Sequence, residues 1–173
     1  MTRFSLRNLR LRPGEEHREE IPIELGPLTL GGSTYEPTPA VTPAELVVQR
    51  AQSGDIFRLR FATRVEGQCM RCLGPAAVDV AIDAQEYESS DRAAAEELRS
   101  EYVHEGELEV GAWAHDQVAL ALPEPILCRP DCAGLCPVCG KNLNDEPHEH
   151  EEVLVDPRWA ALEALRTDAP DEG

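Results

Sequence analysis

The sequence is poor in aromatic residues and contains no long apolar run. Aromatic side chains make up 5% of its 173 residues, and no stretch approaches the ~18 consecutive apolar residues that a membrane span needs. The N-terminal stretch 1–20 contains arginines but no apolar segment, so it does not resemble a secretory signal. We therefore expect a cytoplasmic protein with a modest core, whose cysteines stay reduced and bind metal rather than form disulfides.

Basic residues are scarce as well. The chain has 16 lysines and arginines against 33 aspartates and glutamates, a formal net charge of −17. Generic binding to a nucleic-acid backbone needs a basic face, so this balance argues against it and favours a basic partner such as a ribosomal protein. A local group of arginines near the N-terminus leaves contact with RNA open: Arg3, Arg7, Arg10 and Arg12.

The sequence also lacks a catalytic pattern. It offers no Ser/His/Asp set, no glycine-rich phosphate loop and no pair of carboxylates that would face one another in a pocket. His115 and Asp116 adjoin each other at the start of a predicted helix, and we interpret them as capping and surface residues. We therefore expect a protein without enzymatic activity.

Alternating apolar and polar residues predict antiparallel strands on both sides of a turn. The alternation is clear in residues 56–61 and resumes in 77–89, which places Cys69 and Cys72 in the turn between two strands. The proline- and threonine-rich stretch 31–43 is expected to be a loop.

Two helices are predicted in the second half of the chain. Residues 113–127 indicate a buried helix that passes through Leu120 and is ended by Pro123. The stretch "DPRWAALEALR", residues 156–166, begins with Asp156 as a helix cap and a proline at the first helical position. We expect its apolar face to pack back on the sheet.

The strongest local signal is "CPVCG", residues 136–140. Two cysteines three positions apart, followed by glycine, are typical of a knuckle in which the chain reverses and both sulfurs face one ion. Gly140 supplies the backbone freedom that this reversal needs. His148 and His150 would complete a tetrahedral site if their segment is extended, since residues two apart then share a face. Acidic neighbours are candidates to accept the outer imidazole N–H groups: Glu146, Glu149, Glu151 and Glu152.

The remaining cysteines form two pairs, in "CMRC" (69–72) and "CRPDC" (128–132), and two arrangements are open. In the first, these four cysteines hold one zinc ion, and the "CPVCG" cysteines hold another with the histidines. In the second, a single zinc is held by the "CPVCG" cysteines with either the histidines or an upstream pair, and a cysteine of "CRPDC" is a small buried side chain. The eight candidate metal ligands are Cys69, Cys72, Cys128, Cys132, Cys136, Cys139, His148 and His150.

Other cysteine chemistries fit the sequence poorly. The spacing C-x3-C-x2-C that begins at Cys132 occurs in radical-SAM iron–sulfur enzymes, but only 34 residues follow Cys139, too few for the barrel of such an enzyme. A thioredoxin-like dithiol would start a helix, whereas "LGPA" follows Cys72 directly. A catalytic zinc would keep an open position beside a general base, and the acidic run around His148 is interpreted as a solvated surface. We therefore expect structural zinc.

These patterns predict an α+β fold: an antiparallel β-meander with one central helix, a zinc-knuckle segment and a C-terminal helix. We expect the β-rich core with its central helix in residues 1–127. The zinc-knuckle segment, the C-terminal helix and a disordered acidic tail are expected in residues 128–173.

Four stretches in this order, "CMRCLGPA", "ALALPEPILC", "DCAGLCPVCGKNLN" and "DPRWAALEALR", closely resemble the YceD-like family of large ribosomal RNA subunit accumulation proteins. The resemblance covers roughly residues 45–166. It implies a bacterial or plastid cytoplasmic protein needed for accumulation of the large-subunit (23S) ribosomal RNA, without established catalytic activity. Some members place Cys-x-Cys where this chain has His148 and His150, which supports metal ligation by these histidines.

The sequence therefore predicts a non-catalytic factor in ribosomal RNA accumulation, processing or assembly of the large subunit. Its partner is expected to be a basic ribosomal protein or precursor rRNA, contacted in the latter case by arginines of the N-terminus and of the strand 56–64. The alternatives are a metal-dependent RNA-processing enzyme and a zinc-ribbon module associated with transcription. The number of zinc ions and the oligomeric state stay open.

Overall fold

The computed structural model describes residues 2–91 and 93–150, and the chain divides into two compact units, Met1–Ala133 and Gly134–Gly173. The sequence-based boundary lay between residues 127 and 128. The structure keeps Cys128 and Cys132 with the first unit, where they contact sulfurs of the turn predicted between two strands. Within the described part of the chain, no helix is long and apolar enough to cross a membrane.

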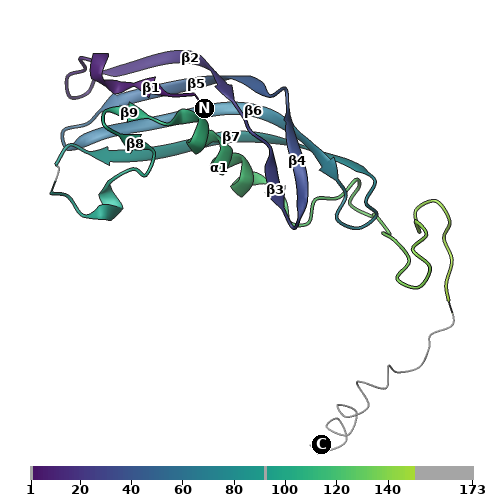
Figure 1. The fold of residues 1–173 in the computed structure, drawn as a ribbon. Helices are drawn as coiled ribbons and strands as arrows, with labels where there is room; N and C mark the ends of the chain where they lie inside the picture. Colours follow the sequence, from purple (N-terminus) through teal and green to yellow (C-terminus); the bar gives the residue numbers. More distant parts are fainter. Residues whose placement is uncertain (1, 92, 151–173) are drawn as a thin grey trace, which may run out of the picture. The chain divides into compact units, whose positions relative to one another are not determined.

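The first unit is built on a six-stranded antiparallel sheet (Figure 1). The strand order is β2-β5-β6-β4-β3, and β7 pairs with the other side of β6. The strands are β2 (Glu16–Glu24), β3 (Leu28–Leu30), β4 (Ser33–Thr38), β5 (Val41–Arg50), β6 (Gly54–Gln68) and β7 (Pro75–Ser89). The hairpin of β6 and β7 pairs from Gly54 opposite Ser89 to Gln68 opposite Pro75, so the predicted turn with its two cysteines lies at the tip of a long hairpin.

Smaller elements complete this unit. The short strands β1 (Phe4–Ser5), β9 (Glu107–Leu108) and β8 (Val103–His104) form a second antiparallel sheet. The α-helix α1 (Val110–Ala121) lies against one face of the large sheet (Figure 1). Two 3-10 turns, Leu6–Asn8 and Glu96–Leu98, stand in the connections.

The two faces of the large sheet follow from the alternation in β6. Phe57 and Leu59 are fully buried and pack in one core with Trp113 of α1. Arg58 and Arg60, which alternate with these residues along the strand, reach the opposite face and stay partly exposed. Because successive side chains of a strand point to opposite faces, one apolar face is enough to build the core. The described fold is thus mostly antiparallel β-sheet with one α-helix, as predicted.

The expectation of a loop over residues 31–43 is wrong. This stretch contains β4 and the start of β5, because Tyr35 is 1% exposed and donates its hydroxyl to the carbonyl of Gln68 at 2.9 Å. Gly67 makes room for the ring, since a Cβ at this position would overlap with Tyr35. Burial of one aromatic side chain therefore outweighs the loop-forming composition.

The helix prediction is partly wrong. The helix begins at Val110 and ends at Ala121, and it buries Trp113 and Val118, whereas Leu120 is 78% exposed. Leu120 follows Val118 by two positions, and at 3.6 residues per turn this places it on the far side of the helix. The second helix, predicted for residues 156–166, lies outside the described residues.

Candidate metal centres

The turn between β6 and β7 forms a first knuckle. The N–H of Cys69 donates to the carbonyl of Gly74 at 2.8 Å, and the N–H of Leu73 donates to the carbonyl of Cys69 at 3.0 Å. The N–H of Arg71 lies 3.4 Å from the Cys69 sulfur, as in knuckles where backbone donors stabilise a thiolate. Leu73 closes the turn with φ of 60°, in the left-handed region.

Cys128 and Cys132, which follow α1, bring two more sulfurs to this knuckle. The sulfur of Cys132 lies 3.7 Å from that of Cys69, and the sulfur of Cys128 lies 3.6 Å from that of Cys72. All four sulfurs lie within 4.8 Å of one another, so the four cysteines form one group, called the four-cysteine group below.

Two hydrogen bonds hold the segment that follows α1, residues 126–132, against the turn between β6 and β7. The N–H of Met70 donates to the carbonyl of Ile126 at 2.9 Å, and the guanidinium of Arg71 donates to the carbonyl of Cys132 at 3.0 Å. Ile126 is buried in the core. Packing and hydrogen bonds of the protein itself therefore bring the sulfurs together.

The stretch "CPVCG" forms a second knuckle in the second unit. The N–H of Cys136 donates to the carbonyl of Lys141 at 2.8 Å, and the N–H of Gly140 donates to the carbonyl of Cys136 at 2.8 Å. Gly140 has φ of 72°, in the left-handed region that glycine adopts without strain, as predicted for this position. The pattern of hydrogen bonds matches that of the first knuckle, with Gly140 in the place of Leu73.

The two histidines complete the second group. His148 Nε2 lies 3.1 Å from the sulfur of Cys139, and the rings of His148 and His150 have centroids 4.9 Å apart. One ligand atom from each of Cys136, Cys139, His148 and His150 lies within 4.8 Å of the others, and these four residues are called the Cys2His2 group below. The structure thus gathers the eight candidates as the two-site arrangement groups them.

The orientation of His148 leaves one ring nitrogen for a metal. Its Nδ1 lies 2.7 Å from the backbone carbonyl of Glu146, so Nδ1 carries the proton and Nε2 faces the sulfurs. The glutamate therefore contributes its carbonyl to the histidine, while its carboxylate pairs with Lys141 at 2.6 Å. Sequence reasoning named the carboxylates of this acidic run and missed the carbonyl, as it missed Arg71 at the other group. Glu151 and Glu152 lie outside the described residues.

The pKa values of the thiols indicate that the four-cysteine group needs a cation to hold all its thiolates. Burial opposes ionisation of Cys69, but hydrogen bonds from the backbone of Cys72, Cys128 and Arg71 outweigh it and lower the pKa of the Cys69 thiol to about 6. Burial and the neighbouring thiols raise the pKa of Cys128 to about 12. Facing thiols cannot all ionise together unless a cation lies between them.

The donor sets fit zinc. Four thiolates, or two thiolates with two imidazoles, are the tetrahedral sets of structural zinc sites, in which protein atoms fill every position. In the Cys2His2 group, the backbone N–H of Cys139 is the main reason that the pKa of Cys136 is lowered to about 6, which favours the thiolate that zinc binds.

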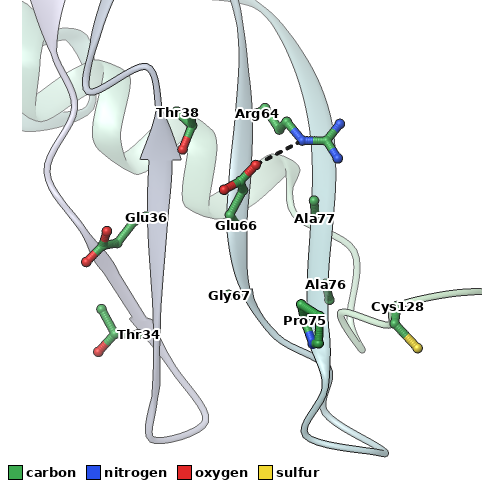
Figure 2. A pocket seen from close by; sticks show the side chains of 10 residues that line it. All are labelled: Thr34, Glu36, Thr38, Arg64, Glu66, Gly67, Pro75, Ala76, Ala77 and Cys128. Carbon is green, nitrogen blue, oxygen red and sulfur yellow. Dashed lines mark hydrogen bonds and ion pairs between the residues drawn. The ribbon is translucent and has the colours of Figure 1, made fainter.

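A polar groove of about 720 Å³ adjoins the four-cysteine group (Figure 2). Glu36 of β4 and Glu66 of β6 stand opposite each other in it, and Glu66 pairs with Arg64 at 3.2 Å. The ten residues that line this groove include no histidine, and their one thiol is Cys128.

Known proteins resemble this chain over a large part of its length. A protein of Mycobacterium tuberculosis and one of Mycobacterium bovis, both called uncharacterized, are 35% identical to it over 128 residues, 71% of this chain and 61% of theirs. A protein of Mycobacterium leprae is 33% identical over 109 residues, 60% of this chain and 49% of its own length. The chain thus spans less than two thirds of these relatives, and no solved structure matches it.

The family model for the large ribosomal RNA subunit accumulation protein YceD matches residues 57–166. This range begins in β6 and includes all eight residues of the two groups. The resemblance stated from the sequence motifs is therefore confirmed: the chain belongs to the YceD family of large ribosomal RNA subunit accumulation proteins.

Proposed function

We propose that this chain supports accumulation of the large-subunit (23S) ribosomal RNA as a cytoplasmic binding factor without catalytic activity, and that its direct partner is a basic protein of the large subunit. Two structural zinc ions, one in each group, hold the binding-competent fold. The observation that carries the choice of partner is the pairing of the arginines on the sheet.

Each of the three strand arginines that were candidates for RNA contact meets a carboxylate. Arg58 donates two hydrogen bonds of 2.6 Å to Asp83, which holds the pKa of Asp83 at about 2. Arg60 lies 3.5 Å from Glu45, and Arg64 lies 3.2 Å from an oxygen of the Asp79 carboxylate.

Phosphate binding depends on cationic groups that release counterions. Arginines that are already neutralised by adjacent carboxylates contribute little to it, and the same carboxylates repel a phosphate. The face of the sheet that carries these pairs is better suited to a cationic protein surface.

The N-terminal arginines are partly engaged as well. Arg3 pairs with Glu109 at 2.9 Å, and the guanidinium of Arg7 donates to the carbonyl of Glu105 at 2.9 Å. These contacts tie the N-terminal segment to the short sheet and to the start of α1. A structural use of these arginines supports the basic-protein partner over the RNA backbone.

The metal groups support a non-catalytic role. Each group supplies four protein ligands, which is a full tetrahedral set without a position for a substrate. When bound, zinc supplies a fixed tetrahedral centre there. The backbone hydrogen bonds of each knuckle orient the cysteine ligands.

The test is a binding comparison with purified components. The zinc-loaded protein is incubated with the basic proteins of the large subunit and, separately, with protein-free precursor 23S RNA at graded salt. We expect retention of one or a few basic proteins and weak, strongly salt-dependent binding of the RNA. Tight RNA binding at physiological salt would contradict the choice of partner.

The same preparation separates the alternatives. Cleavage of the precursor RNA that requires metal, and that Cys136→Ser abolishes while the first unit stays folded, would show an RNA-processing enzyme. Co-purification with RNA polymerase instead of ribosomal particles would favour a transcription module.

A further inference from the structure

A second groove, mostly apolar, lies at one end of the large sheet, and none of the eight candidate metal ligands line it. It has a volume of about 660 Å³ and is formed where the turn after β2 and the start of β5 meet the first turns of α1. It is called the α1 groove below, and the residues that line it include Glu24, Leu25, Ala40, Val41, Ala112 and Asp116.

Much of the lining of the α1 groove is apolar, and several of its side chains are small. Val41 is 51% exposed, unusual for an apolar residue that begins a central strand, and Leu25 is buried beside it. Ala40 and Ala112 leave the space between the strand and the helix open. A cavity of this size with an apolar lining suits one or two inserted side chains of a ligand.

Carboxylates stand among the lining residues. Asp116 is fixed on one oxygen by the hydroxyl of Tyr102 at 3.1 Å and on the other by Nδ1 of His115 at 3.2 Å. The other ring nitrogen of His115 lies 3.4 Å from the carbonyl of Pro27, so the imidazole stands between the helix and the turn after β2. Glu24 lines the groove as well, from the end of β2.

The charges select the kind of ligand. Two carboxylates among the lining residues and a net charge of −17 repel an acidic segment and favour lysine or arginine. An apolar anchor held in a pocket with charged residues around it is the usual anatomy of an interface hot spot.

We propose that the α1 groove receives an apolar side chain of a basic peptide segment, whose neighbouring lysines or arginines contact Glu24 and Asp116. This inference rests on the proposed function, since it assigns the docking site for the basic partner. The occupant of the groove is thus a segment of another protein. A second copy of this chain is the alternative that the test detects.

The probe is a fluorescein-labelled synthetic peptide with one central leucine between lysines and arginines. Its partner peptides replace the leucine by serine, or every basic residue by glutamate. Fluorescence anisotropy with the zinc-loaded 173-residue protein should show binding of the first peptide, at least about tenfold weaker binding of the serine peptide and none of the acidic one.

Two variants of exposed residues in the groove give the structural test. Val41→Lys, and independently Ala40→Lys, should weaken binding of the leucine peptide about tenfold, because each places a cation where the basic segment docks. Leu120→Lys is the matched control: it makes the same change at an apolar residue that is 78% exposed and does not line the groove, and it should leave affinity within about twofold. Zinc content and thermal unfolding verify that each variant is folded.

Several outcomes overturn the proposal. They are absence of peptide binding by the wild-type protein, equal affinity for the leucine and serine peptides, or equal effects of Val41→Lys and Leu120→Lys. A concentration-dependent dimer in analytical ultracentrifugation that Val41→Lys abolishes would assign the groove to a second copy instead.

A sedimentation experiment separates this inference from the function on which it rests. Tagged wild-type and Val41→Lys proteins are expressed in cells and followed in gradients of ribosomal particles. If both co-sediment equally with large-subunit precursors, the groove proposal fails and the proposed function stands. If the wild-type protein does not co-sediment, the proposed function fails, whatever the peptide result.

Discussion

Leu73 and Gly140 occupy the same place in the two knuckles. Replacing the leucine by glycine, and the glycine by alanine, should shift the two zinc affinities in opposite directions. Both have positive φ, 60° at Leu73 and 72° at Gly140. This left-handed conformation costs an L-residue about 1–2 kcal/mol and costs glycine almost nothing. Gly140→Ala should therefore weaken zinc binding by the Cys2His2 group, and Leu73→Gly should strengthen zinc binding by the four-cysteine group.

The magnitude follows from the backbone alone. An ideal Cβ at Gly140 meets no atom within 4 Å, so no steric overlap adds to the cost, and Leu73 is 58% exposed, so little burial is lost. Glycine has more conformational freedom than other residues in the unfolded chain and loses it on folding. This offsets about 0.4–1 kcal/mol of the strain that an L-residue carries in the left-handed region. The net change is about 1 kcal/mol at each position. Since metal binding is coupled to folding of the knuckle, this is about fivefold in the dissociation constant for zinc.

Competition with a chelator measures both affinities in one protein. Native mass spectrometry counts the zinc ions as chelator is added, and NMR of the cadmium-113 form distinguishes the thiolate site from the mixed site. Val138→Ala, an exposed position between the two cysteines of the second knuckle, is the control and should change nothing. The reasoning is refuted if Gly140→Ala leaves the affinity of the Cys2His2 group unchanged, or if Leu73→Gly weakens the four-cysteine group.

Three further outcomes are expected. Arg71→Ala removes the guanidinium that donates to the Cys132 carbonyl, so zinc should leave the four-cysteine group several-fold faster, as a colorimetric chelator would record; an unchanged rate would contradict this positioning role. Gly67→Ala should cost about 1–3 kcal/mol in the free energy of unfolding, because its Cβ overlaps with Tyr35, whereas Gly26→Ala meets no atom within 4 Å and should stay within about 0.5 kcal/mol in urea titrations. Complete chelation should collapse the dispersed amide signals of both knuckles in nitrogen-15 NMR spectra, and zinc should restore them; recovery of both after a single equivalent would contradict two sites.

The hairpin of β6 and β7 and the two knuckles could be predicted from the sequence because their signals are local. Alternation in residues 56–61 reports which side of one strand is buried, and two cysteines followed by a turn report one reversal of the chain. Neither inference needs knowledge of distant contacts. The position of Cys69 and Cys72 at the tip of the hairpin follows from the same local patterns.

What the sequence left open depends on contacts between distant residues. The strand at 33–38 exists because Tyr35 packs against β6 where Gly67 has no side chain, and composition alone describes this stretch as a loop. The grouping of Cys128 and Cys132 with the first knuckle likewise depends on hydrogen bonds across the fold, such as that from Arg71. Spacing along the chain carries no information about either contact.

The two metal groups join residues at very different separations along the chain, and this difference suggests different roles. In the four-cysteine group, the sulfurs in contact are 63 and 56 residues apart in the chain, whereas Cys139 and His148 are nine apart. Closing a long loop restricts the unfolded chain more than closing a short one does. A metal ion should therefore stabilise the fold more at the four-cysteine group than at the Cys2His2 group. Loss of the first ion therefore acts on the whole sheet unit, while loss of the second acts on a segment too short to bury a core of its own. A defect in ribosomal RNA accumulation from a variant of the Cys2His2 group, in a chain whose sheet unit is still folded, would assign a direct role in partner binding to that segment.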